Sequence, residues 1–365
     1  MAQLLRKIPM PSIFAAILRF VKLRWRLILG IGVSVLCLYL VVRGIDWSKL
    51  WSVYRTADYW FLLPAILVIL GCSYARARRW KLLIAPAERI SITRLFHIVN
   101  VGYLFNNLLP AKVGELVRAY LVGRIVEGGF AKALSTLIVE RLLDVLCVVI
   151  LLVILIPFVA LPAWATRAGL IFGAAAILGV TMLVVLARFG ERGLNWVWRY
   201  LGRLPLIGKP RVRGWLANLI AGLVPLTKLR LVPGIALWSL VLWFGYALLN
   251  YTLLAAFRMT ASVSFAVSAF ALCATGFGMI VPSSPGAMGV FEGAVVLAFG
   301  LYGVDASQAF AYAFGLHMFT NLALIVLGLI GLRAESLNFG QISRQVSEGQ
   351  GVAGTNPPPT ADKTV

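Results

Sequence analysis

Long apolar runs divide this sequence, and they constrain its fold more than any other feature. The longest runs cover residues 133–158, 168–187, 231–257 and 307–332, with shorter ones at 27–42 and 60–73. A helix needs about 20 apolar residues to cross the hydrocarbon core of a bilayer, where backbone groups must hydrogen-bond internally. Residues from the set AVILMFWYC make up 61% of the chain and charged residues only 13%, which leaves too little polar surface for a soluble enzyme. We therefore predict an all-α polytopic membrane protein with about eight membrane segments.

The charge of the chain indicates orientation rather than nucleic-acid binding. Lys and Arg number 34 against 13 Asp and Glu, a net charge of +21. Basic residues are concentrated in three blocks between the apolar runs: 21 lie in 1–26, 76–94 and 188–230, against five in 43–58, 159–168 and 258–262. Since cytoplasmic loops are enriched in Lys and Arg, this asymmetry predicts a multi-pass protein of the bacterial inner membrane with both termini in the cytoplasm. The basic loops would face anionic lipids of the inner leaflet, with no nucleic-acid partner.

The same pattern divides the chain into regions. Residues 1–26 are expected to be a basic cytoplasmic N-terminus, 27–332 the transmembrane domain, and 333–365 a cytoplasmic, mostly disordered tail. Within the domain, residues 188–230 are predicted to be a cytoplasmic amphipathic linker. Its interleaved tryptophans are also compatible with single-stranded nucleic acid, but a position between two spans favours lipid. The four cysteines and two histidines have no metal-site spacing, so neither a metal nor another cofactor is expected.

Two apolar segments are interrupted by matching Pro/Gly motifs. The first is PAKVGE at 110–115 and the second is PGAMGVFE at 285–292; each has the form Pro-x3-Gly followed by a carboxylate, and the offset is 175 residues. In the N-inside arrangement the first would form a re-entrant hairpin open to the cytoplasm and the second one open to the outside, which makes an inverted repeat. Paired interrupted segments of this kind indicate a transport site. The alternative is that Pro and Gly only kink two spanning helices.

A helix that restarts after such a break directs free N–H groups inward. A restart at Gly114 or at Gly286 would therefore offer an anion site suited to phosphate.

Charged side chains inside the apolar runs are the other candidates, because an intramembrane charge needs a partner or water. Glu115 and Arg118 are three residues apart, as are Arg141 and Asp144, so each pair can form an ion pair on a helix. One interpretation is that these pairs only hold the helix bundle together. The other is that Arg118 and Arg141 hold a lipid phosphate while the acids meet a cation or a proton.

The predicted substrate-binding residues come from both breaks and from the following span. They are Asn106, Asn107, Pro110, Gly114, Glu115, Arg118, Glu140, Arg141, Asp144, Pro285, Gly286, Gly289 and Glu292. His317 and Asn321 are secondary candidates, four residues apart on the last span, for which an interhelical hydrogen bond is the expected role. No catalytic residue and no metal ligand is predicted.

Three motifs in order resemble the transmembrane region of the lysylphosphatidylglycerol synthase family. They are NNLLPAKVGELVR at 106–118, ERLLD at 140–144 and PSSPGAMGVFE at 282–292, and the resemblance covers roughly residues 27–332. In that family the transmembrane part is associated with lipid flipping, and a separate soluble domain transfers an amino acid to phosphatidylglycerol. About 33 residues follow the last span, too few for that domain, so the resemblance implies a stand-alone flippase-like member without synthase activity.

The resulting expectation is a translocator that moves a phospholipid or a polyprenyl-phosphate-linked lipid between leaflets, with a phosphate headgroup bound between the hairpins. No Gly-x4-Gly-Lys-Ser/Thr motif occurs, so ATP hydrolysis by this chain is not expected. Two alternatives stay open: a membrane transferase acting on such a lipid, and a lipid-binding partner protein that transports nothing.

Overall fold

Every regular element in the described part of the chain is helical. A computed structural model of the protein describes residues 32–84, 90–109, 113–161, 163–201, 210–279 and 284–347. The α-helices are Gly32–Val42, α2 (Trp47–Thr56), α3 (Leu62–Ile84), α4 (Ile92–Leu108), α5 (Val113–Gly123), α6 (Gly129–Leu155), α7 (Ala163–Leu201), α8 (Pro210–Ala221), α9 (Val232–Ala256), α10 (Phe265–Gly278), α11 (Val290–Gly300), α12 (Ala306–Ala334) and α13 (Phe339–Ser347). Short 3-10 turns are η1 (Tyr59–Phe61), η2 (Val224–Thr227), η3 (Leu229–Leu231) and η4 (Pro285–Ala287).

Four of the described helices are long and apolar enough to cross a membrane. They cover Tyr59–Ile84, Thr166–Gly190, Leu229–Ala256 and Ala306–Ala334. Shorter apolar helices, among them Gly32–Val42 and Phe265–Gly278, accompany them. The prediction of an all-α polytopic membrane protein is confirmed.

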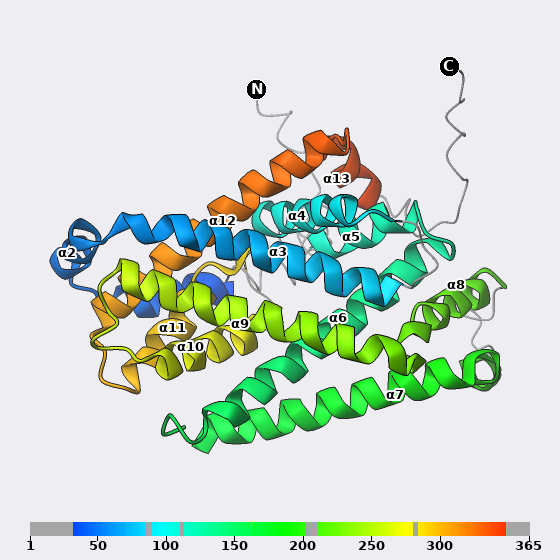
Figure 1. Ribbon diagram of the computed structural model, residues 1–365, viewed down its shortest axis with the longest axis horizontal. Helices are drawn as coiled ribbons and strands as arrows, with labels where there is room; N and C mark the ends of the chain where they lie inside the picture. The colour runs from blue at the N-terminus through cyan, green and yellow to red at the C-terminus, as the bar shows by residue number, and fades with distance from the viewer. Residues whose placement is uncertain are drawn as a thin grey trace, which may run out of the picture.

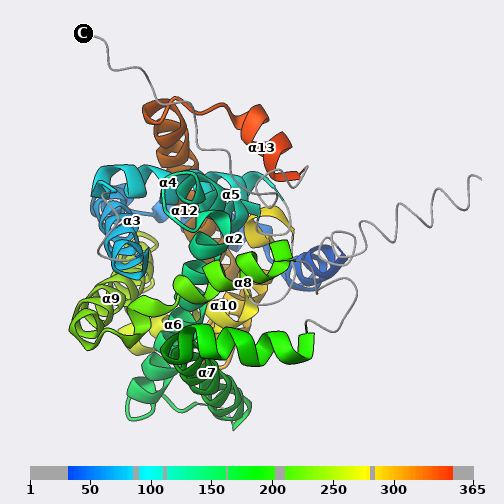
Figure 2. The same cartoon turned by 90° about the vertical axis from the view of Figure 1, so that its right-hand side faces the viewer.

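The two interrupted segments form hairpins in opposite halves of the molecule. In Figure 1, α3, α6, α7, α9 and α12 run along the long axis, with α4 and α5 towards one end and α10 and α11 towards the other. Figure 2, turned by 90°, shows α3 beside α9 at one edge of the bundle, away from α7. Within each hairpin the two helices pack against each other, as α4 does on α5 and α10 on α11. An 11-residue helix such as α5 or α11 is only about 16 Å long, about half the thickness of the hydrocarbon core.

Both hairpins begin with the same local signal. The Ser91 hydroxyl accepts from the Arg94 N–H at the start of α4, and the Ser264 hydroxyl accepts from the Val267 N–H at the start of α10. A serine at this position satisfies one of the N–H groups that a helix start leaves without a partner. The polar residue that precedes each apolar run therefore fixes where each hairpin enters the bundle.

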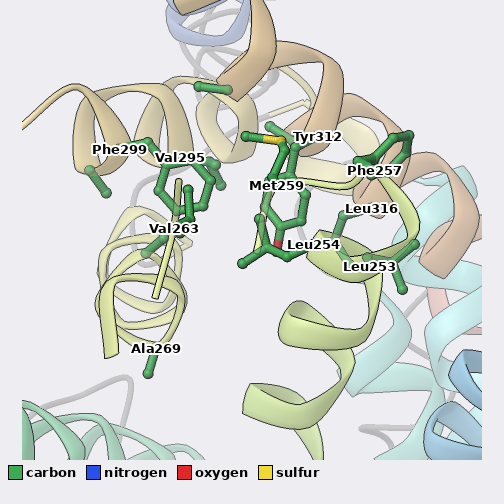
Figure 3. Close-up of a cluster of buried hydrophobic side chains, with 14 of the residues drawn as sticks. Leu253, Leu254, Phe257, Met259, Val263, Ala269, Val295, Phe299, Tyr312 and Leu316 are labelled. Atoms are coloured by element: carbon green, nitrogen blue, oxygen red, sulfur yellow. The ribbon is translucent and has the colours of Figure 1, made fainter. Parts of the chain in front are cut away.

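Each hairpin has its own apolar core. Around α10 and α11, Leu253, Phe257, Val295, Phe299 and Tyr312 pack together from three helices (Figure 3). A second cluster surrounds α4 and α5 and includes side chains from α3 and the first half of α6.

The span of α7 packs closely on α6 through small residues. A Cβ added at Gly169 would lie 3.3 Å from Leu152, and one added at Gly173 would lie 2.8 Å from Val149. The Gly169-x3-Gly173 pattern therefore serves helix packing within the chain. At Gly190 the backbone leaves the helical region, so the residues after it run in a new direction towards α8.

Candidate site at the two hairpin breaks

Glu140 on α6 is the centre of a buried charge cluster. Its two carboxylate oxygens accept from the two terminal nitrogens of Arg118 on α5, at 3.1 and 2.9 Å. Arg76 on α3 donates to the same carboxylate, and so does Arg141, at 2.8 Å. Glu140 lies 11 residues after the first residue of α6, which places it about 16 Å along that helix and near its middle.

Asp144, one helical turn further on, extends the cluster. Arg79 Nη2 donates to its Oδ1 at 2.6 Å, and Arg76 Nη1 lies 3.3 Å from its Oδ2. Arg141 Nη1 lies 3.4 Å from the same Oδ2, as the spacing predicted, and Arg141 Nε lies 3.3 Å from Glu115 Oε1. The predicted pairing of Glu115 with Arg118 is replaced, because Arg118 turns to Glu140.

We call this group the arginine cluster: Arg76, Arg79, Glu115, Arg118, Glu140, Arg141 and Asp144. Its four guanidinium groups face three carboxylates, so it carries one positive charge in excess. Most of its members are buried, Glu140 and Arg79 completely. The open part is formed by Arg141, whose side chain is 44% exposed, and Glu115, at 26%.

Aromatic side chains hold the arginines in place. The Arg118 guanidinium lies 4.2 Å from the Trp80 ring centre, and the Trp80 indole N–H donates to Thr136 on α6 at 2.9 Å. Arg76 donates to the Tyr246 hydroxyl at 3.1 Å and lies over the Tyr103 ring. A cation over an aromatic face is stabilised when water is excluded, so these rings fix the orientation of buried charges.

Arg76 and Arg79 are the site residues that the sequence argument missed. They were assigned to the inward basic block 76–94, but the structure places both inside α3, buried against α6. A signal for this exists, since the two arginines are three residues apart and lie on one face of a helix. Counting basic residues to predict orientation could not separate them from Arg78, which lies over the Trp238 ring instead.

The helices after the two breaks begin close to the predicted Gly114 and directly after Gly289, at Val113 and Val290, but no α-helix begins at Gly286. At the first break the Asn106 side chain accepts from the Gly114 N–H at 2.8 Å. At the second, the α-helix begins at Val290 rather than at Gly286, because Gly286 and Gly289 both have positive φ, 65° and 84°. The Gly289 N–H donates to Glu292 Oε2 at 2.6 Å. Both N–H groups therefore have protein acceptors, and neither is available to a phosphate in this conformation.

The second break contains one buried pair in place of a cluster. Glu292 Oε1 lies 2.7 Å from His317 Nδ1, and both side chains are buried. The interhelical hydrogen bond predicted for His317 is thus present, with Glu292 as its partner. Within the described residues, no group of three or more His, Cys, Asp or Glu could hold a metal ion.

The tips of the two hairpins meet. A Cβ added at Gly286 would lie 3.9 Å from the Asn107 carbonyl oxygen and 3.4 Å from the Asn321 amide nitrogen. Asn107 also has a buried amide nitrogen without a partner among the described residues. Pro285 is the first residue of η4 at this junction, whereas Pro110 and Pro282 lie outside the described residues. The two motifs, 175 residues apart in sequence, therefore lie next to each other in space.

Comparisons with known proteins agree with this architecture. The family described as the lysylphosphatidylglycerol synthase TM region matches residues 3–328. A UPF0104 membrane protein of Methanothermobacter thermautotrophicus is 26% identical over 310 residues, 80% of this chain and 89% of the relative. A UPF0104 membrane protein of Methanocaldococcus jannaschii is 24% identical over 225 residues, 62% of this chain and 91% of the relative. No solved structure matches. The chain thus belongs to the lysylphosphatidylglycerol synthase TM region family and is a multi-pass membrane protein.

Proposed function

We propose that this protein moves a lipid with a phosphate-containing headgroup between the leaflets of the cytoplasmic membrane. The observation that carries the proposal is the single excess positive charge of the arginine cluster, about halfway along α6. A charge at that depth is costly unless it serves an ion or substrate pathway. An anionic lipid headgroup would balance the charge as it passes.

Hydrogen-bond donors in the cluster support the same assignment. The Nε atoms of Arg76, Arg79 and Arg118 are buried and have no acceptor among the described residues. A buried donor without an acceptor loses free energy that a phosphate oxygen would restore. Arg141 has the exposed guanidinium of the cluster, so we assign it the first contact with the headgroup. Arg118 donates to both oxygens of Glu140, and we assign it the structural role of fixing that carboxylate next to Arg141.

The arrangement of the hairpins supports a transport cycle. They lie in opposite halves of the molecule and their tips meet, so movement of one against the other would open the arginine cluster to alternate ends. The end of α7 and α8, the described helices of the basic segment 188–230, lie towards the end where α4 and α5 lie, and we take this end as cytoplasmic. A transferase reaction is not part of the proposal, since both carboxylates of Glu140 and Asp144 already accept from arginines.

The test uses vesicles containing the purified full chain and a headgroup-labelled phosphatidylglycerol, with a membrane-impermeant quencher reporting the outer leaflet. Wild-type protein is expected to move the label between leaflets faster than protein-free vesicles. Arg141→Gln should slow the movement about tenfold or more, since a hydrogen bond to a charged group contributes ~1.5–3 kcal/mol.

Arg78→Gln is the matched control, because Arg78 is an arginine of α3 that contacts Trp238 rather than the cluster. It should leave the rate unchanged. Wild-type vesicles that move no label, or equal loss in both variants, would contradict the proposal. Conversion of a labelled lipid into a new product by wild-type protein would favour the transferase alternative.

A further inference from the structure

The second break contains a buried acid–base pair that lipid binding at the arginine cluster does not use. Both Glu292 oxygens are engaged, Oε1 with His317 Nδ1 at 2.7 Å and Oε2 with the Gly289 N–H at 2.6 Å. The ring of Phe291 stacks on His317 with centroids 4.3 Å apart. Glu292 is completely buried, so its charge must be balanced by its immediate partners.

The nature of the partner distinguishes this pair from the arginine cluster. Glu140 is balanced by arginines, which do not lose their proton in proteins. Glu292 is balanced by an imidazole, which gains and loses a proton near neutral pH. With a proton on each ring nitrogen of His317 the pair is neutral overall, and without the second proton it carries one negative charge.

The other titratable groups around the pair do not balance the charge of Glu292. The elements packed against α11 carry Cys37 and Tyr39 on Gly32–Val42, with Arg43 directly after that helix, Cys273 on α10, and Tyr312 and Arg333 on α12. Nearby Tyr54 on α2 donates its hydroxyl to the Ala311 carbonyl oxygen at 2.9 Å. Burial, with smaller contributions from Tyr59 and Glu292, raises the pKa of Tyr54 to about 12, so it stays protonated. Among these described residues, His317 is the base in contact with Glu292.

We propose that Glu292 and His317 form a proton-binding site whose occupancy is coupled to lipid movement. The inference rests on the proposed lipid translocation, and it names the proton as the ion that drives this movement. Buried acids and histidines in membrane segments are the usual components of proton-coupled transporters.

A chain of contacts connects the pair to the junction of the hairpins. Glu292 holds the start of α11 through Gly289, and Gly286, three residues earlier, lies against Asn107 of the first hairpin. Asn321, one helical turn after His317 on α12, lies near the same Gly286. Release of the proton leaves a negative charge on the pair. This charge strengthens the attraction of Glu292 to the Gly289 N–H and to the positive end of the α11 dipole. The protonation state therefore acts on the contact between the two hairpin tips.

The first test measures the proton without measuring transport. The chain has two histidines, so His97→Asn leaves His317 as the one histidine signal in a ¹⁵N spectrum. In purified full-length His97→Asn protein, spectra recorded over a range of pH are expected to show the His317 ring changing protonation in one step. Adding Glu292→Gln should change this step, because the carboxylate that contacts the ring is then replaced by a neutral amide. A ring that stays in one state over this range, or a step that Glu292→Gln does not move, would overturn the inference.

The second test separates this inference from the proposed function. Vesicles with the full chain and labelled phosphatidylglycerol are examined with and without a gradient of one pH unit. One proton per lipid should sustain an accumulation of about tenfold in one leaflet. Glu292→Gln and His317→Gln should lose this accumulation and keep downhill equilibration, which also shows that they fold.

The outcomes are distinct. Downhill movement that ignores the gradient in wild-type protein would overturn the proton site and leave the translocator proposal standing. No movement in either condition would count against the translocator itself. Should Glu292→Gln fail to fold because the α11 cap is lost, His317→Gln carries the test, since it leaves the bond between Glu292 and Gly289 in place.

Discussion

Beside the first break, carboxylates on α5 and α6 are surrounded by four arginines, whereas beside the second break a carboxylate on α11 faces a single histidine. The backbone plan is shared: a serine-capped helix, an interruption with glycine, and a short second helix with an acid in its first turn. The repeat therefore preserves shape more closely than chemistry. One copy pairs its acids with arginines, which keep their proton, and the other pairs its acid with an imidazole.

The largest expected effect is at the first break, on replacing Glu140 with Gln. This change leaves several arginines buried without their shared acceptor, and loss of one partner of a buried ion pair costs about 3–5 kcal/mol. Chemical unfolding in detergent micelles measures it. Glu115→Gln, which alters the partly exposed pair with Arg141, should cost about 1 kcal/mol or less. Equal losses for the two variants would mean that the cluster does not act as a buried unit.

Glycines at both breaks should resist substitution for different reasons. A Cβ at Gly114 collides with the Gly102 carbonyl oxygen, and at Gly289 the positive φ of 84° adds backbone strain to a collision with Ser34. Gly114→Ala and Gly289→Ala should each destabilise the protein by about 1–3 kcal/mol in the same unfolding experiment. Gly300→Ala on α11, with open space around it, should instead be neutral or stabilising by up to ~1 kcal/mol. A neutral Gly114→Ala would show that the hairpin is looser than described.

The chemical difference between the breaks can be removed by His317→Arg. The ion pair with Glu292 remains but its cation no longer titrates, so the second break becomes like the first. Downhill lipid movement should continue while its dependence on a pH gradient is lost, a change of up to ~1.4 kcal/mol per pH unit. The vesicle experiment above measures both. Persistence of the gradient response would place the proton elsewhere.

The smallest effects should come from the aromatic stacks next to each break. Phe339 on α13 stacks on Phe105 at 4.4 Å, just before the first break, and Phe291 stacks on His317 at the second. Phe339→Leu and Phe291→Leu should each destabilise by about 0.5–1.5 kcal/mol. The loss at Phe291 should depend on pH and that at Phe339 should not, because only Phe291 touches the ring of the proposed proton-binding site. Unfolding curves at two pH values distinguish these results.

Much of the helical plan could be predicted from the sequence, because length and hydrophobicity fix where helices can cross a bilayer. The matching motifs at 110–115 and 285–292 also indicated two hairpins, since Pro and Gly interrupt helices for local reasons. Arg76 and Arg79 could not be assigned in the same way: charge counting treats every arginine as solvated, and only the packing of α3 on α6 shows that they are buried. The close approach of Gly289 to Ser34 on Gly32–Val42 could not be read from the sequence either, because it depends on how two distant segments pack.

Backbone-to-backbone contact in the first hairpin limits how the molecule can move. Where Gly102 meets Gly114 the two backbones are in direct contact, with the Arg118 and Asn106 side chains packed beside them. Packed elements of this kind shift as rigid bodies, with the bending taken up at their ends. We therefore expect the α4–α5 hairpin to tilt as one rigid body in the bundle. An acyl chain would then pass beside the hairpin and not between its two helices.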